Sequence, residues 1–153
     1  MIVEPERYIE RFAEAGSDSI TVHVEACKDV KATIDLIKKT GKKPGLALHP
    51  ETDIKEVFPY LDMIDRVIIM TVRTGFGGQK YMDECTQKII DLRQEIDKRN
   101  LKTHIAVDGG VTLSNVDMIV NAGADIIVSG SSVFAGDIKQ NVKAFNERFE
   151  DNK

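Results

Sequence analysis

The residue best placed to do chemistry is a lone carboxylate that ends a short apolar run. The run covers residues 105–107 and stops at Asp108. Gly109 and Gly110 follow directly. In parallel α/β proteins, an acid at the carboxyl end of a buried strand lies where active sites are built. Asp108 is therefore predicted as a catalytic acid or base, although an Asp-Gly turn or a helix N-cap fits the local pattern equally well.

A glycine-rich stretch follows another apolar run and could cradle an anion. Residues 73–79 read RTGFGGQ, with glycines at positions 75, 77 and 78. Glycines let backbone N–H groups point toward a phosphate without interference from Cβ atoms. The spacing differs from that of the dinucleotide-binding motif. We predict a phosphate-binding loop, with a flexible connection between strand and helix as the alternative.

A second candidate anion site follows the last apolar run. Residues 129–132 read SGSS and stand at a predicted helix start. The first N–H groups of a helix are unpaired, and its dipole favours negative charge. Gly130 and Ser131 are therefore candidate phosphate contacts, although a plain serine N-cap accounts for the same pattern.

The remaining reactive side chains are expected to have structural roles. His23 ends a β-branched run and is predicted as a hydrogen-bonded neighbour of the site. His49, which precedes a proline, and His104 are expected to be structural or solvated. Cys27 and Cys85 have no base nearby in the sequence, so a nucleophilic cysteine is not predicted.

Hydrophobic patterning predicts five strands that alternate with helices. Apolar runs predict strands at residues 19–24, 43–48, 66–72, 103–107 and 125–129. Amphipathic segments predict helices at residues 6–15, 29–39, 83–99, 113–122 and 138–149, with a short one from residue 52. In the longest helix, the residues expected to face the core are Ile89, Ile90, Leu92 and Ile96. This alternation indicates a parallel α/β sheet covered by helices. The count alone would suit a small doubly wound sheet, because a complete (β/α)8 barrel needs about 250 residues.

The composition describes an ordinary globular protein. The chain has 153 residues, is 42% hydrophobic and 30% charged, and carries a formal net charge of −4. This charge, without a basic patch, argues against nucleic acid as the main partner. No stretch approaches the ~20 apolar residues that cross a bilayer. Two cysteines fit a reducing cytosol. We expect one cytoplasmic domain over residues 1–153.

The first residues lack the features of a secretion signal. Residues 1–6 contain neither a basic region nor a long apolar run. They are predicted to be the tail of a strand followed at once by a helix. The chain is therefore expected to begin within a domain.

Taken together, these stretches are more specific than any one of them. Six segments follow the order and spacing of the ribulose-phosphate 3-epimerase family: residues 1–5, 21–26, 70–72, 75–80, 107–111 and 128–131. The chain closely resembles this family over essentially its whole length. The resemblance implies a phosphate-binding TIM (β/α)8 barrel, of which this chain carries only the later, C-terminal units.

The resemblance also implies an activity and a cofactor. Members of the family interconvert D-ribulose 5-phosphate and D-xylulose 5-phosphate, a step of the pentose phosphate pathway. Two aspartates on opposite faces of the substrate transfer the proton at C3. A divalent metal cation polarises the carbonyl, with zinc expected first and iron, manganese or cobalt as alternatives. Members often form homo-oligomers.

Individual residues take implied roles when they are matched to the family motifs. Asp108 resembles the second catalytic aspartate, which is also a metal ligand in the family. The implied phosphate-binding positions are Gly75, Phe76, Gly77, Gly78, Gly130 and Ser131. Gly109 and Gly110 are implied as backbone contacts beside the aspartate.

The chain departs from the family pattern in two places. The family's first aspartate and one metal histidine lie in a His-x-Asp-x-Met-Asp-Gly stretch, and a second metal histidine precedes the position of Met1. None of these is present, so Asp108 is one of four expected metal ligands. Arg73 and Thr74 also replace the usual Asn-Pro or Glu-Pro before the glycine loop, which adds a cation near the phosphate side.

Three functional hypotheses follow. The first is an epimerase chain without its N-terminal third, poorly active alone because a partial set of cooperating catalytic residues retains little activity. The second is a non-catalytic sugar-phosphate-binding fragment, or half of an assembly completed by another chain. The third is a 3-epimerase of a six-carbon ketose phosphate such as allulose 6-phosphate. In each case the predicted partner is a small sugar phosphate, with no nucleic acid and no membrane.

Overall fold

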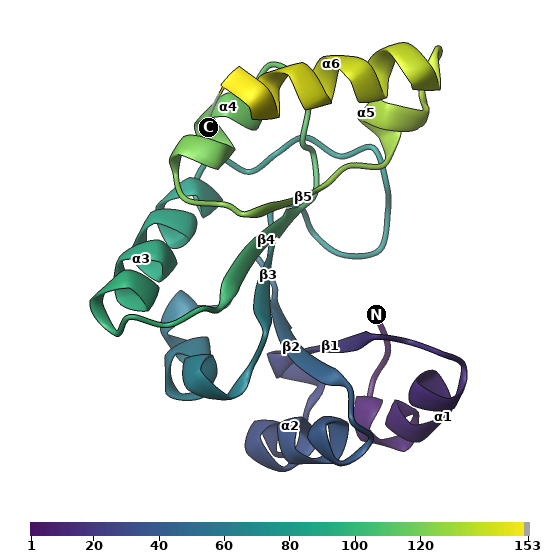
Figure 1. The fold of residues 1–153 in the computed structure, drawn as a ribbon, viewed down its shortest axis with the longest axis vertical. Coiled ribbons are helices and arrows are strands. Elements are labelled where there is room, and N and C mark those ends of the chain that lie inside the picture. The colour runs from purple at the N-terminus through teal and green to yellow at the C-terminus, as the bar shows by residue number, and fades with distance from the viewer. Residues whose placement is uncertain (152–153) are drawn as a thin grey trace.

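Five parallel strands form one curved sheet (Figure 1). The computed structural model describes residues 1–151, with the side chains of residues 1–149. The strands are β1 (Ser19–His23), β2 (Lys43–Leu48), β3 (Arg66–Met70), β4 (His104–Asp108) and β5 (Ile126–Val128). Each strand pairs in parallel with the next one along the chain. All five predicted strands are confirmed, and β3 ends at Met70 rather than at Val72.

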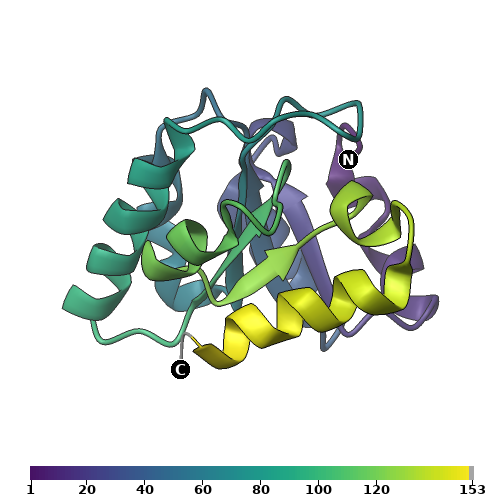
Figure 2. The ribbon, with the colours of Figure 1, turned by 90° about the horizontal axis from the view of Figure 1, so that it is seen from above.

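The order of the strands identifies the sheet as part of a barrel. The five strands lie in the order β1-β2-β3-β4-β5. A doubly wound sheet reverses its strand order at a switch point, so the sequential order excludes that alternative. In a (β/α)8 barrel each strand lies beside the next, and the helices form the outer layer. Figure 2 shows the helices surrounding the strands in this way.

Helical segments connect the strands and cover the sheet. The α-helices are α1 (Ile9–Glu14), α2 (Val30–Lys39), α3 (Cys85–Lys98), α4 (Val116–Asn121), α5 (Ser131–Phe134) and α6 (Ile138–Asp151). The 3-10 segments are η1 (Pro5–Arg7), η2 (Val24–Ala26) and η3 (Ile54–Met63). The short helix predicted from residue 52 is η3, which contains Pro59, a residue without an N–H donor. Within residues 1–151, no helix combines the length and apolar character needed to cross a membrane.

The N-terminal segment differs from its prediction in two ways. Residues 1–3 form no strand. The helix predicted over residues 6–15 is divided into η1 and α1. Pro5 begins the first of these turns, and Tyr8 between them has a φ of −118°, far from the helical value. The chain therefore enters the sheet through two short turns instead of one helix.

The central strands are buried on both faces. In β2 every residue after Lys43 is buried, and β4 has three consecutive buried residues. The edge strands β1 and β5 are less buried. Strands that are covered on both faces have continuous apolar sequences. The apolar runs therefore predicted the positions of these strands.

The helix α3 contributes four residues to the core, of which Cys85 is the first. Ile89, Leu92 and Ile96 are fully buried, as their helical spacing predicts. Ile90 is only partly buried and lies in a surface hollow beside Met118. The prediction that Ile90 faces the core is therefore wrong, because one residue advances the helix by about 100°.

Two neighbouring isoleucines of α3 allow a matched test of this packing. Ile89→Ala is expected to lower the free energy of unfolding by about 2–5 kcal/mol, since it leaves a cavity in the core. Ile90→Ala removes the same atoms from a partly exposed position and should cost clearly less. Urea unfolding of both variants measures the difference. Equal losses would contradict the assignment of the buried face.

Candidate active site at the carboxyl ends of the strands

Asp108 is the last residue of β4, and its backbone is held by the neighbouring strand. In the parallel register it lies opposite Met70 of β3 and Val128 of β5. The N–H of Thr71 donates to the Asp108 carbonyl at 2.9 Å. The Thr71 hydroxyl lies 3.2 Å from the same carbonyl and 2.5 Å from that of Gly109. Because Thr71 is fully buried, these contacts fix the position from which the carboxylate projects.

The carboxylate of Asp108 is not used to cap a helix. The N-cap of α4 is Asn115. The Asn115 side chain accepts the N–H of Thr112 at 2.8 Å and donates to the Gly110 carbonyl at 3.0 Å, which closes the turn after β4. Within residues 1–149, the Asp108 carboxylate has no hydrogen bond or ion pair. The N-cap alternative from the sequence is therefore wrong.

The two glycines after Asp108 are required by close packing. Gly110 has a φ of +65°, and a Cβ there would lie 2.2 Å from the backbone nitrogen of Tyr81. Gly109 has a φ of +124°, and its Cβ would lie 2.5 Å from a methyl group of Val72. The turn thus packs directly against the segment that follows β3, which brings the loops after β3 and β4 together.

The glycine-rich loop after β3 is held in shape by one side chain. The Gln79 amide donates to the carbonyl of Arg73 at 2.6 Å and to that of Phe76 at 2.7 Å. Gly75 and Gly78 have positive φ angles, which glycine adopts readily. Arg73 pairs with Glu51 at 2.8 Å and remains largely exposed. The loop is therefore a closed turn rather than an extended connection.

Two serines hold the loop after β5 against the turn that follows β4. The hydroxyls of Ser129 and Ser132 donate to the Val111 carbonyl at 3.3 and 2.7 Å. Gly130 precedes α5, which has only four residues. Since so short a helix has a small dipole, any anion bound here would depend mainly on the loop N–H groups.

The candidate residues named from the sequence surround one cleft. It has a volume of about 670 Å³ and is lined by Asp108, Gly75, Phe76, Gly77, Gly78, Gly109, Gly110, Gly130 and Ser131, among others. A second cleft of about 420 Å³ adjoins it on the side of β1 and shares Met1, Met70 and Asp108 with the first. Asp108 thus lies where the two clefts meet. Its catalytic role and the phosphate-binding roles stay predictions.

Burial alone perturbs the ionisation of Asp108. The pKa of its carboxyl is raised, because removal from water disfavours the charged form and no nearby cation compensates. A carboxyl whose pKa lies above the ordinary range holds and releases a proton closer to neutral pH. The residue is therefore suited to general acid and base chemistry.

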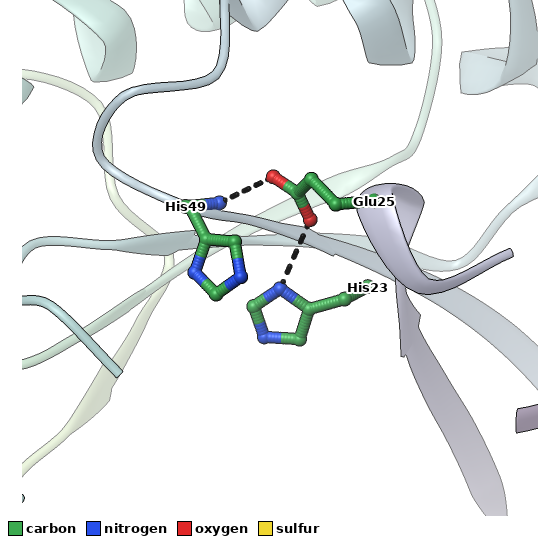
Figure 3. Close-up of side chains that lie close together, drawn as sticks. All are labelled: His23, Glu25 and His49. Atoms are coloured by element: carbon green, nitrogen blue, oxygen red, sulfur yellow. Dashed lines mark hydrogen bonds and ion pairs between the residues drawn. The ribbon is translucent and has the colours of Figure 1, made fainter. Parts of the chain in front are cut away.

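Three side chains of the kinds that can ligate a metal lie together at the carboxyl ends of β1 and β2. His23, Glu25 and His49 offer ligand atoms within 4.8 Å of one another, and the group could hold a metal ion. Figure 3 shows the two Glu25 oxygens bonded to the His23 ring and to the His49 backbone nitrogen. Sequence reasoning gave His49 a structural or solvated role and did not consider Glu25. The places of both histidines at strand ends were visible in the sequence, but their proximity depends on the pairing of β1 and β2.

Hydrogen bonds join the Glu25 carboxylate to the His23 ring and to the backbone N–H of His49. Burial lowers the pKa of His23, although its hydrogen bond to Glu25 opposes this. Burial alone would raise the pKa of Glu25, but hydrogen bonds from the Thr52 hydroxyl and the His49 N–H outweigh it and lower the pKa. His23 therefore favours its neutral form and Glu25 its charged form, as metal ligands require.

Asp108 does not belong to this metal-binding group. Among the described residues, no two further histidine, cysteine or acidic side chains accompany it closely enough to form a metal site. The residues present therefore do not fit the four-ligand metal centre that the sequence resemblance implies at Asp108.

The close packing of Gly110 leads to a stability prediction. Gly110→Ala should cost about 1–2 kcal/mol for the left-handed backbone and about 1–3 kcal/mol for the collision with the chain at Tyr81. Gly77→Ala is the control, because Gly77 has open space around it and no positive φ. Chemical denaturation gives both free energies of unfolding. A tolerated Gly110→Ala would disprove the packing of the two loops.

The raised pKa of Asp108 leads to a pH-dependent prediction. Above the unfolded-state value of 3.8, the native state holds this proton more strongly than the unfolded state does, so ionisation destabilises the fold. Asp108→Asn should therefore raise the free energy of unfolding at pH 7. The gain should disappear below pH 3.8, where both states are protonated.

Denaturant unfolding at pH 7 and pH 3 measures this effect. Asp62→Asn, at an exposed position outside the clefts, is the control and should change stability by less than about 0.5 kcal/mol. A loss of stability in Asp108→Asn at pH 7 would contradict the effect of burial.

Solved structures with low sequence identity share the fold. A 3-hexulose-6-phosphate synthase from Salmonella typhimurium matches with a TM-score of 0.73 and 21% identity, over 100% of this chain and 71% of that one. A 3-keto-L-gulonate-6-phosphate decarboxylase from Vibrio cholerae matches with a TM-score of 0.69 and 18% identity, over 98% and 69%. These likenesses support the assignment of a partial α/β barrel.

Sequence comparison gives the family. Three proteins named ribulose-phosphate 3-epimerase, from Bacillus subtilis, Synechocystis and Escherichia coli, are 42%, 46% and 38% identical over 88% of this chain. The chain spans 62%, 59% and 60% of their lengths. The model of the ribulose-phosphate 3 epimerase family matches residues 1–134. The chain therefore belongs to the ribulose-phosphate 3-epimerase family.

Proposed function

We propose that this chain supplies the phosphate-binding loops and one acid-base group of a ribulose-phosphate 3-epimerase. The observation that carries the proposal is the shared cleft, in which Asp108 faces the same space as both glycine-containing loops. The identity to named epimerases supports the choice of substrate, D-ribulose 5-phosphate or D-xylulose 5-phosphate. The catalytic role falls to Asp108, and the phosphate contacts fall to the loops at residues 75–78, 109–110 and 130–131.

The proposed chemistry is a proton transfer next to a carbonyl. The backbone N–H groups of the glycine loops hold the phosphate, which directs C3 of the ketose toward Asp108. The carboxylate takes the C3 proton, and the resulting acid can return it to the same face. The raised pKa of Asp108 brings this exchange closer to neutral pH.

Inversion at C3 needs a second acid on the opposite face. Among the described residues, Asp108 is the one carboxylate that lines either cleft. By itself the chain should therefore exchange the C3 proton on one face without interconverting the epimers. The divalent metal expected for the family, with zinc first, would need ligands besides Asp108 that the described residues do not supply there, and we assign it no step.

The setting of the chain is also part of the proposal. Among residues 1–151, the edge strands β1 and β5 each have one side without a strand partner, and Phe12 and Phe134 are 49% and 69% exposed. Open strand edges and exposed apolar groups favour association, so we propose a homo-oligomer. Cys27 and Cys85 are both free thiols, which supports a reducing, cytoplasmic location.

Isotope exchange at C3 tests the proposal. The purified chain is incubated in deuterium oxide with D-ribulose 5-phosphate or D-xylulose 5-phosphate, and the C3 proton signal is followed by NMR. One epimer, whose C3 proton faces Asp108, should lose its signal without forming the other epimer. Asp108→Asn should reduce the exchange rate by about 10²-fold or more, and Asp62→Asn should leave it unchanged.

The other outcomes separate the competing functions. Binding of both ketose phosphates without exchange would favour a non-catalytic phosphate-binding fragment. Faster exchange with allulose 6-phosphate would favour a hexulose-phosphate epimerase. Interconversion of the two pentulose phosphates would disprove the claim that the chain lacks the second acid.

A further inference from the structure

We propose that His23, Glu25 and His49 form a zinc site that is separate from Asp108. The site lies at the carboxyl ends of the neighbouring strands β1 and β2 and uses two imidazoles and one carboxylate. It does not depend on the epimerase function proposed above. Nothing in the sequence resemblance assigns a metal to these three residues.

The strand register brings the three side chains together. His23 ends β1 and is paired with Ala47 in the parallel ladder, so β2 passes beside it and ends one residue before His49. Glu25 lies in η2, the turn that follows β1 directly. The imidazole rings of His23 and His49 have centroids 4.5 Å apart (Figure 3). Three donors from two adjacent strand ends thus face one small volume.

The distance between the first two donors fits a shared metal ion. His23 Nδ1 and a Glu25 carboxylate oxygen, Oε2, lie 3.2 Å apart. A charge-assisted hydrogen bond between such atoms is usually about 2.7–2.9 Å long. Two ligands at about 2.0–2.1 Å from a tetrahedral zinc ion are about 3.3 Å apart. One ligand atom from each of the three residues lies within 4.8 Å of the others, and rotation of the His49 side chain can bring its ring nitrogen closer.

The second oxygen of Glu25 is held by groups that a metal would not displace. Its Oε1 accepts the backbone N–H of His49 at 2.8 Å and also the hydroxyl of Thr52. These two bonds orient the carboxylate and leave Oε2 directed at His23. Fixed outer hydrogen bonds of this kind raise metal affinity, because the ligand is already positioned.

The donor set selects the type of metal. Two imidazole nitrogens and one carboxylate oxygen suit zinc and similar transition metals, whereas magnesium and calcium prefer oxygen ligands alone. Three protein ligands leave the fourth position of a tetrahedral zinc ion open. Glu25 is exposed to solvent, so the ion and its water have a path to the site.

Isothermal titration calorimetry with zinc chloride tests the proposal on the full chain after removal of metals with EDTA. The wild-type chain should bind one zinc ion, and His49→Gln should weaken the affinity at least tenfold. His49→Gln keeps the backbone N–H that holds Glu25, so the fold should be retained, as circular dichroism can verify. Magnesium chloride should give no binding at this position.

Two matched variants separate this site from other zinc binding. His104→Gln removes an exposed histidine at the start of β4, and Asp108→Asn removes the carboxylate of the candidate active site. Both should bind zinc as the wild type does. On zinc addition, the ring signals of His23 and His49 should shift in NMR spectra, while that of His104 should not.

The proposal is overturned if His49→Gln binds zinc with wild-type affinity, or if Asp108→Asn loses the site to the same extent. Absence of zinc binding by the wild-type chain would show that the three side chains form a hydrogen-bonded cluster only. The readout is zinc binding in the absence of sugar phosphate. Its failure is therefore distinct from a failure of the exchange experiment.

Discussion

The parallel hydrogen bonding between β3 and β4 determines where the parts of the candidate site lie. The register sets Met70 opposite Asp108, and the next residue, Thr71, binds the carbonyls of Asp108 and Gly109. A shift by one residue would turn the Asp108 side chain to the other face of the sheet. The backbone pairing therefore decides whether the carboxylate meets the cleft, before any ligand is considered.

The burial of Asp108 shows a conflict between stability and chemistry. A carboxylate without hydrogen bonds at the end of a buried strand costs free energy, and its raised pKa reflects that cost. Glu25, which follows β1 and lies three strands away, shows the opposite arrangement, because hydrogen bonds satisfy it and lower its pKa. The carboxyl end of the sheet thus holds Asp108, an acid suited to proton transfer, and Glu25, an acid that remains charged.

The apolar pattern predicted the five parallel strands, whereas the partial barrel was implied by the family resemblance, because the strand count alone suited a doubly wound sheet. The buried strands read as apolar runs, and the positions of Asp108 and the glycine loops follow from their places at strand ends. Two things depended on tertiary contacts. Gly110 is needed because the chain at Tyr81, far from it in the sequence, packs against it. His49 and Glu25 meet because β1 and β2 pair, which no spacing along the chain could reveal.

The sequential strand order has a consequence for how the sheet holds together. Each strand forms its ladder with the strand that precedes or follows it in the chain, so every pairing is closed by a single connecting segment. Cooperativity then passes between nearest neighbours, much as it does in repeat proteins. The five strands and their helices can therefore share one hydrophobic core without the strand pairing that closes a complete barrel. Each ladder nevertheless joins residues at least about 20 positions apart, because parallel strands need a connecting segment between them.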